Sequence, residues 1–247
     1  MNFEPWQWVL LLAGAFFVGL SKTGIAGLSI LFVAVFANLM PARQATGLVL
    51  PLLIIGDVCA VGLYRRHTQW SHLWTLFPWT IGGVLLGWCA LQALNDGQTK
   101  RLVGVLLALM LAVHLWRQRK AGREVEMVAV APWWFAALTG LMAGFATQVS
   151  NAAGPVMMLY LLAMRLPKLE FLGTGAVFFL LLNWFKVPFM VQLGLINPVS
   201  IGLNLKLAPA VLLGATIGRL VAGRINQRIF ERVALILTAI ATLRLLV

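Results

Sequence analysis

Long apolar runs separated by short polar stretches account for nearly the whole chain. A helix needs about 20 apolar residues to cross the hydrocarbon core of a membrane. Five runs have roughly that length and a sixth is shorter, at residues 45–63, 73–94, 171–193, 199–222, 229–246 and 102–116. Apolar and polar residues do not alternate in these runs as they do in a membrane β-strand. The pattern therefore predicts an all-α bundle of transmembrane helices.

Composition agrees with a protein that lies almost entirely in or beside a bilayer. Hydrophobic residues make up 61% of the 247 residues and charged residues only 11%, whereas a soluble domain carries about 25% charge. Two cysteines, Cys59 and Cys89, are too few for a secreted disulfide scaffold. The net charge of +12 comes mostly from short loops without a nucleic-acid motif. We therefore expect a multi-pass membrane protein whose surroundings are lipid and not nucleic acid.

Two further apolar runs do not fit a single crossing. Residues 6–39 and 133–166 are each about 34 residues long, too long for one ordinary span and too short for two. Each is interrupted halfway by Gly, Ser, Thr, Asn or Pro, at residues 19–27 and 144–155. These residue types weaken a helix or compete for its hydrogen bonds. Each run is therefore predicted to form two half-helices that meet at a polar tip inside the membrane.

Several Pro, Gly and polar residues of the first half of the sequence recur in the second half at one of two constant offsets. The pairs at an offset of 126 are Pro41/Pro167, Gly47/Gly173 and Asp57/Asn183, and those at 131 are Pro78/Pro209, Gly83/Gly214, Gly87/Gly218, Asn95/Asn226 and Arg101/Arg232. The sequence thus predicts one transmembrane domain, residues 1–247, made of a first repeat at 1–117, a linker at 118–131 and a second repeat at 132–247. The glycine pairs predict close helix packing inside the protein, and a homodimer that forms through them is the alternative.

Loop cations indicate how the two repeats are oriented. If both long runs cross the membrane, the cations divide seven against eight between the two sides. If each long run is a re-entrant hairpin, eleven lie on one side, namely Arg65, Arg66, Arg117, Arg119, Lys120, Arg123, Arg165, Lys168, Arg224, Arg228 and Arg232. Only Arg43, Lys100, Arg101 and Arg244 lie opposite. The positive-inside rule favours the second topology, with the eleven and the linker in the cytoplasm.

This topology predicts two inverted repeats, each a broken re-entrant hairpin followed by three transmembrane helices. Three spans per repeat reverse the second repeat relative to the first, so that the hairpins enter from opposite sides. Their tips would then meet near the midplane, where inverted-repeat transporters bind their substrates.

Lys22 is the first candidate site residue, because charges inside a membrane are costly and usually functional. It lies between Ser21 and Thr23 and next to Gly24 in the first break. We expect a half-helix to begin near residues 23–24, so that its N–H groups, the two hydroxyls and Lys22 bind an anion. The alternatives are that Lys22 neutralises Asp57 as a structural pair, or that its side chain snorkels to the membrane surface.

The second break contributes uncharged donors. Thr147, Gln148, Ser150 and Asn151 can donate hydrogen bonds to a small oxyanion. The alternative is that Ser150 or Asn151 only caps a half-helix that starts near Ala152.

Asn183 and Lys186 lie three residues apart, on one face of a predicted helix. Because Asn183 is the repeat partner of Asp57, both are expected near the pseudo-two-fold axis and the hairpin tips. We therefore add Asn183 and Lys186 to the substrate site. Asp57 is predicted either to carry a proton during transport or to remain ionised beside a lysine.

Asn204 and Lys206 lie several residues into another span and are predicted to line an access path, unless Lys206 snorkels outward. The sequence contains no catalytic constellation, and its His and Cys residues lack metal-ligand spacing. We therefore expect no enzyme activity, no cofactor and no metal.

The residues of both breaks resemble a known family. The run Gly-Leu-Ser-Lys-Thr-Gly-Ile-Ala-Gly at 19–27, Pro41 and Arg43 before the next span, and Ser-Asn-Ala-Ala-Gly-Pro at 150–155 resemble the sulfite exporter TauE/SafE family, also called the toluenesulfonate uptake permease family. The resemblance covers essentially the whole chain. It implies transport of sulfite, organosulfonates or related small anions across the bacterial inner membrane, with export the commoner direction.

Together these observations predict a secondary transporter that exports small sulfur-containing anions by alternating access around a midplane site. No ATP-binding motif is present, so a gradient must supply the energy of uphill transport. The alternative from another class is a non-transporting membrane subunit that docks a soluble partner.

Overall fold

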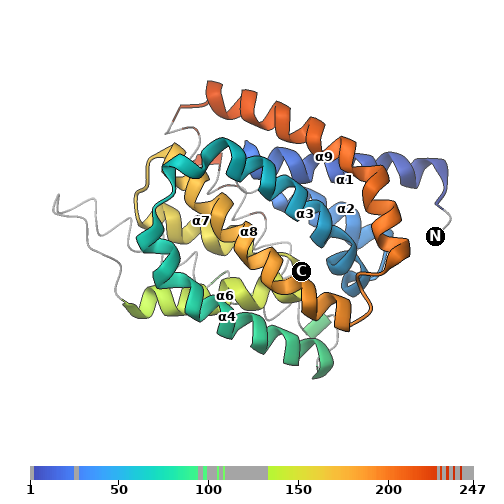
Figure 1. Ribbon diagram of the computed structural model, residues 1–247, viewed down its shortest axis with the longest axis horizontal. Helices are drawn as coiled ribbons and strands as arrows, with labels where there is room; N and C mark the ends of the chain where they lie inside the picture. The colour runs from blue at the N-terminus through green and yellow to red at the C-terminus, as the bar shows by residue number, and fades with distance from the viewer. Residues whose placement is uncertain are drawn as a thin grey trace.

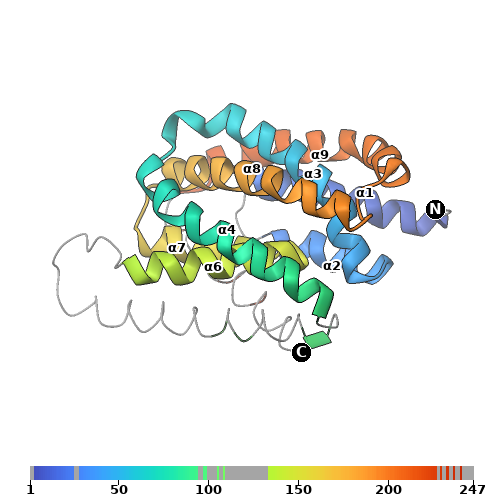
Figure 2. The same ribbon diagram turned by 60° about the horizontal axis from the view of Figure 1, so that its bottom comes forward.

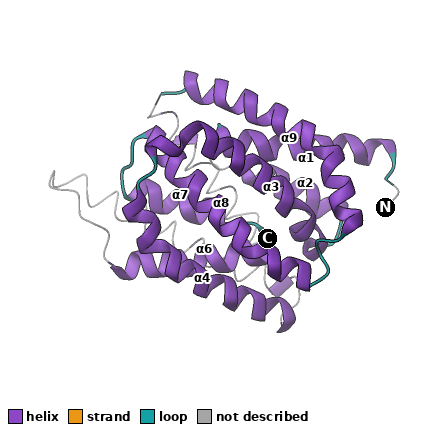
Figure 3. Cartoon of the chain, in the orientation of Figure 1, coloured by secondary structure: helices purple, strands orange, loops and turns teal. Residues whose placement is uncertain are grey.

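The computed structural model of the chain describes residues 3–24, 28–93, 97–98, 105, 108, 133–226, 229, 232–233, 236 and 240. Secondary structure throughout this part is helical, which confirms the predicted class (Figure 3). The elements are α1 (Pro5–Thr23), α2 (Ser29–Leu39), α3 (Ala42–Tyr64), the 3-10 turn η1 (Arg65–His67), α4 (Trp70–Ala93), α6 (Trp133–Ser150), α7 (Ala153–Ala163), α8 (Lys168–Gln192) and α9 (Pro198–Arg224). The predicted spans at 102–116 and 229–246 and the predicted linker at 118–131 lie wholly or mostly outside the described residues.

Four helical segments in the described part are long and apolar enough to cross a membrane, and they coincide with four of the predicted spans. They are Arg43–His67, Trp70–Gln92, Lys168–Gln192 and Pro198–Arg224. Large apolar side chains on these helices are exposed, for example Leu205 at 70% and Trp74 at 66%. Apolar surface of this kind is suited to contact with lipid.

Both long apolar runs break into two helices that fold back on each other. In the first run the ring of Phe36 on α2 packs against Gly14 on α1. In the second run the rings of Phe135 on α6 and Tyr160 on α7 stack with their centroids 6.0 Å apart. Figure 1 shows α1 starting at the right-hand end of the molecule and α6 at the left-hand end. The two hairpins therefore start from opposite ends of the bundle.

Glycines bring two pairs of helices into close contact. A β-carbon on Gly83 of α4 would lie 2.1 Å from the carbonyl oxygen of Leu141 on α6. One on Gly214 of α9 would lie 2.0 Å from the carbonyl oxygen of Phe16 on α1. Only glycine permits this approach, because any side chain would overlap the neighbouring backbone. The predicted packing role of these glycines inside the protein is confirmed.

In Figure 1, α3 and α8 lie between the pair α1/α9 and the pair α4/α6, and Figure 2 shows α8 between α3 and the pair α4/α6. Leu50 of α3 and Met190 of α8 are fully buried in one cluster, which holds the two helices together. The middle of the bundle is therefore lined by α3 and α8, and the broken ends of both hairpins reach it. The candidate site lies in this middle region of the bundle.

Candidate functional site

A cavity of about 70 Å³ lies where the broken ends of the hairpins meet α3 and α8. Its walls are Ser21, Lys22, Ser29, Phe32, Leu53, Asp57, Thr147, Asn151, Gly154, Met157, Met158, Leu161, Phe171, Leu172, Gly175, Ala176, Phe179 and Asn183. Residues of both breaks contribute to one space, although more than 120 positions separate them in the sequence. The predicted proximity of the two tips is confirmed.

Lys22 and Asp57 form an ion pair inside the cavity wall. The Lys22 Nζ lies 2.7 Å from Oδ1 of Asp57, which is fully buried, and the Lys22 side chain is 12% exposed. The same ammonium lies 4.3 Å from the centre of the Phe179 ring, within the range of a cation–π contact. Lys22 thus makes the structural pair considered above and also borders the cavity.

The predicted start of the second half-helix near residues 23–24 is wrong. Helix α1 continues to Thr23, and α2 begins at Ser29. The hydroxyl of Ser21 donates to the Val18 carbonyl and that of Thr23 to the Gly19 carbonyl, so both bonds support the end of α1. Lys22 therefore lies in the last turn of α1, at the negative end of the helix dipole, which also stabilises its charge.

Asn183 on α8 contacts its predicted repeat partner directly. Its Nδ2 donates to Oδ2 of Asp57 over 2.7 Å, and the two residues are 126 positions apart. Asp57 is therefore held by Lys22 on one oxygen and by Asn183 on the other. The Oδ1 of Asn183 has no hydrogen-bond partner among the described residues.

Lys186 organises the second break. Its buried Nζ donates to the Thr147 carbonyl at 2.7 Å, the Thr147 hydroxyl at 3.0 Å and Oδ1 of Asn151 at 2.7 Å. Asn151 has a positive φ of 53° and donates through Nδ2 to the Thr46 carbonyl. The Lys186 amino group thus binds the end of α6 where the chain turns, and Lys186 itself is not part of the cavity wall.

The capping alternative for the second break does not hold. Helix α7 begins at Ala153, next to the predicted start, and its N-cap residue is Ala152, which has no side-chain hydrogen bond to the helix end. The hydroxyl of Ser150 instead donates to the Ala146 carbonyl. Neither Ser150 nor Asn151 is the N-cap of this helix.

Several other predicted site residues lie behind the cavity wall. Thr23 donates to the Ala215 carbonyl over 2.7 Å, and Gly24 packs against Gly218, so both attach α1 to α9. Gln148 is fully buried beside Gly87, and neither atom of its amide has a partner within the described ranges. Of the predicted substrate residues, the cavity wall contains Ser21, Lys22, Asn151 and Asn183, together with Thr147 and Asp57.

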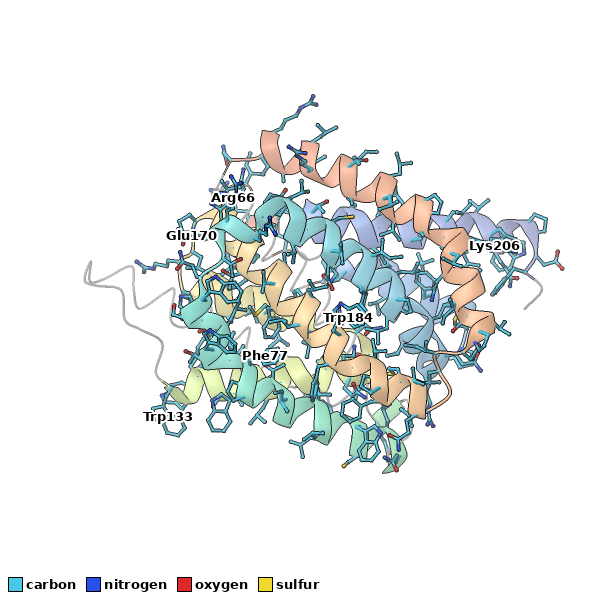
Figure 4. All side chains as sticks on the ribbon, viewed as in Figure 1. Arg66, Phe77, Trp133, Glu170, Trp184 and Lys206 are labelled. Carbon is cyan, nitrogen blue, oxygen red and sulfur yellow. The ribbon has the colours of Figure 1, made fainter. Side chains whose placement is uncertain are left out.

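The two predicted access-path residues also lie away from the cavity wall. Asn204 is buried, and its amide atoms have no partner in the part of the chain that the structure describes. Lys206 lies at the edge of the molecule (Figure 4), where its Nζ is 5.7 Å from the Trp8 ring. This position agrees with the snorkelling alternative for Lys206, and the access path stays a prediction.

The N-termini of α2 and α7 lie close together, although the start of α2 at Ser29 comes later than the predicted start near residues 23–24. A β-carbon on Gly154 would lie 2.7 Å from the Ser29 hydroxyl, so the first turns of the two short helices are close together. The N-cap residues Leu28 and Ala152 make no side-chain cap. Backbone N–H groups at a helix start have no partner within the helix, and the dipole there favours an anion. Ser29, two residues after the last glycine of the break, was the available signal for the first of these starts.

No group of three or more His, Cys, Asp or Glu side chains is placed to hold a metal ion in the described ranges. The polar part of the cavity consists instead of one ammonium, one carboxylate, amides, hydroxyls and two helix starts. These groups suit an anion better than a metal cation.

Apolar spans and a cavity between the helices with a buried ion pair in its wall characterise a helical membrane protein with an internal polar site. The model of the family "Sulfite exporter TauE/SafE" matches residues 11–245, so the chain belongs to this family of membrane transporters. The resemblance found in the sequence is confirmed. No curated protein and no solved structure shows a significant match to the chain.

Proposed function

We propose that the protein is a secondary transporter that exports small sulfur-containing anions, such as sulfite or an organosulfonate, across the bacterial inner membrane. The observation that carries this proposal is the cavity between the two breaks, bordered by Lys22 and by the starts of α2 and α7. The family match supplies the class of cargo.

The cavity wall suits both parts of a sulfonate. Lys22, Ser29 and the first turn of α7 at Gly154 offer donors and positive potential to sulfur-bound oxygens. Phe32, Met157 and other apolar side chains line the remainder and suit a small organic substituent. A cavity of about 70 Å³ has room for only a small ligand.

Alternating access between inverted repeats is the mechanism that we propose. It is supported by hairpins that start from opposite ends of the bundle (Figure 1) and by the contact between Asp57 and Asn183. Inverted-repeat transporters expose a fixed midplane site to each side in turn. Our preferred energy source is a proton gradient that acts through protonation of Asp57. The alternative is the membrane potential, which would drive the exit of an anion.

Reconstitution tests the proposed function. Proteoliposomes that contain the purified protein are expected to release preloaded radiolabelled sulfite faster than empty liposomes. Arg66→Gln removes an exposed charge from η1, and we expect this control variant to release sulfite at the wild-type rate. Release no faster than from empty liposomes, by protein that is folded, would contradict transport and favour the docking subunit.

The proposed topology makes a separate prediction. We expect the cytoplasmic side to hold Arg65, Arg119 and Arg228, of which the last two lie outside the described residues, and the opposite side to hold Arg43. Cysteines introduced at these positions are to be labelled in intact cells by an impermeant thiol reagent, after Cys59 and Cys89 are changed to serine. Only Arg43→Cys should react from outside. Labelling of Arg119→Cys with protection of Arg65→Cys would reject the hairpin topology.

A further inference from the structure

The helix pairs α1/α9 and α4/α6 are packed through corresponding contacts. Glycines of α9 and α4 face backbone carbonyls of α1 and α6 in matching pairs, namely Gly214–Phe16 with Gly83–Leu141, and Gly218–Leu20 with Gly87–Phe145. A shift of 125 positions relates the α1 residues to those of α6, and one of 131 positions relates α4 to α9. The first shift takes Thr23, which faces Gly218, to Gln148, which faces Gly87. Thr23 and Gln148 therefore occupy corresponding places at the ends of α1 and α6.

Thr23 is hydrogen-bonded across its helix pair, whereas Gln148 is not. The fully buried Thr23 hydroxyl donates to the Ala215 carbonyl oxygen of α9 over 2.7 Å. Gln148 is equally buried, yet neither its amide nitrogen nor its amide oxygen has a partner in the described part of the chain. The indole N–H of Trp88, next to Gly87 on α4, is also buried without a partner there. The contact between α4 and α6 thus holds donors and an acceptor that are not satisfied.

An unsatisfied amide in the interior is costly, because water would bond both of its polar atoms. Such a group favours any other conformation of the protein in which it finds a partner. The bond of Thr23 indicates that partner, since the counterpart of Ala215 on α4 is Val84. Val84 lies at the contact with α6, where a β-carbon on Gly144 would be 2.8 Å from its backbone nitrogen. A small movement of α6 along α4 would bring the amide and the Val84 carbonyl together.

We propose that Gln148 is a positioning residue of the transport cycle, which bonds α6 to α4 in the conformation that opens the cavity to the other side of the membrane. This proposal deepens the proposed function and rests on it, because alternating access moves one half of a transporter against the other. Thr23 stabilises the conformation described above, in which its bond exists, and Gln148 stabilises the opposite one. Both side chains lie behind the cavity wall and act on this balance without contact to the substrate.

The reactivity of a cysteine from the two sides of the membrane measures this balance. Ser29→Cys places a thiol in the cavity wall, after Cys59 and Cys89 are changed to serine. Its rate of reaction with the impermeant reagent 2-sulfonatoethyl methanethiosulfonate is to be measured in right-side-out and in inverted membrane vesicles. The rate from each side follows the fraction of protein that is open to that side, so the ratio of the two rates reports the balance. If the thiol does not react from both sides, alternating access itself fails.

Gln148→Met and Thr23→Val are expected to change this ratio in opposite directions. Methionine keeps the length of glutamine but removes the amide, which should favour the conformation described above by about 5- to 150-fold, the cost of one unsatisfied buried group. Valine keeps the shape of threonine but removes the hydroxyl, which should shift the ratio about 2- to 10-fold the other way. Thr139→Val is the matched control, because the buried Thr139 hydroxyl donates to the Phe135 carbonyl of its own helix. It should leave the ratio unchanged.

Two results would overturn the proposal while leaving transport in place. The first is an unchanged ratio in Gln148→Met, or a shift in the same direction as in Thr23→Val. The second comes from thermal unfolding in detergent. Gln148→Met should unfold no lower than the parent protein, because the amide that it removes has no partner in the described ranges. A much lower unfolding temperature would make Gln148 a structural residue of the folded protein. If Thr23→Val fails to fold, the ratio in Gln148→Met decides alone.

Discussion

Lys22→Gln is expected to weaken the apparent affinity for sulfite in the transport assay about 10- to 150-fold. The variant keeps length and polarity but removes the ammonium that borders the cavity, and a charge-assisted hydrogen bond is worth about 1.5–3 kcal/mol. The measurement is the concentration dependence of sulfite flux in proteoliposomes, with Arg66→Gln as the control for loss of one exposed positive charge.

The double variant Lys22→Gln/Asp57→Asn separates the two roles of Lys22. The single change leaves Asp57 buried without the ion-pair partner that now lies 2.7 Å away, which is itself destabilising. Removing both charges takes away this penalty. Recovered sulfite affinity would mean that Lys22 acts only as a structural partner, and continued loss in folded protein would support contact with substrate. Full activity of Lys22→Gln alone would contradict both roles.

Gly214→Ala is expected to destabilise the protein by about 3 kcal/mol or more, at the upper end of what overpacking costs. The added carbon would lie 2.0 Å from the Phe16 carbonyl oxygen, so α9 must move away from α1. Gly83→Ala should act similarly, because its added carbon would lie 2.1 Å from the Leu141 carbonyl oxygen. The measurement is thermal unfolding of the purified variants in detergent.

Gly223→Ala is the matched control on the same helix. Nothing lies within 4 Å of a β-carbon at Gly223, and alanine in a helix is favoured over glycine by up to about 1 kcal/mol. This variant should therefore unfold at the wild-type temperature or slightly above it. Equal unfolding temperatures for Gly214→Ala and Gly223→Ala would show that α1 and α9 are not in close contact.

Both helix breaks could be predicted from the sequence, because their causes are local. Glycines interrupt the first run near Gly24, and the second run turns at Asn151, whose positive φ is one that asparagine tolerates better than most residues. The spans of α3, α4, α8 and α9 were predictable for a similar reason, since apolar length alone defines them. The close glycine contacts followed from their spacing and their recurrence in both halves.

The partners of the polar groups could not be predicted, because they come from distant parts of the chain. Thr23 lies next to Lys22 in sequence but donates to Ala215 on α9, away from the cavity. Lys186 lies three residues from Asn183 but binds the end of α6. Neighbours in a helix point in different directions, and only the packing of other helices decides which direction faces the cavity.

The contact between Asp57 and Asn183 also bears on why the two proposed repeats would lie in one chain. In a symmetric pair of identical subunits, a residue beside the two-fold axis meets its own copy. An aspartate there would face a second aspartate across the 2.7 Å that now separates Oδ2 of Asp57 from Nδ2 of Asn183, and the two like charges would repel. A single polypeptide escapes this restriction, because it can encode an acid at one position and an amide at its counterpart. The Asp57 carboxylate then accepts a hydrogen bond from an amide, where exact symmetry would have placed a second carboxylate.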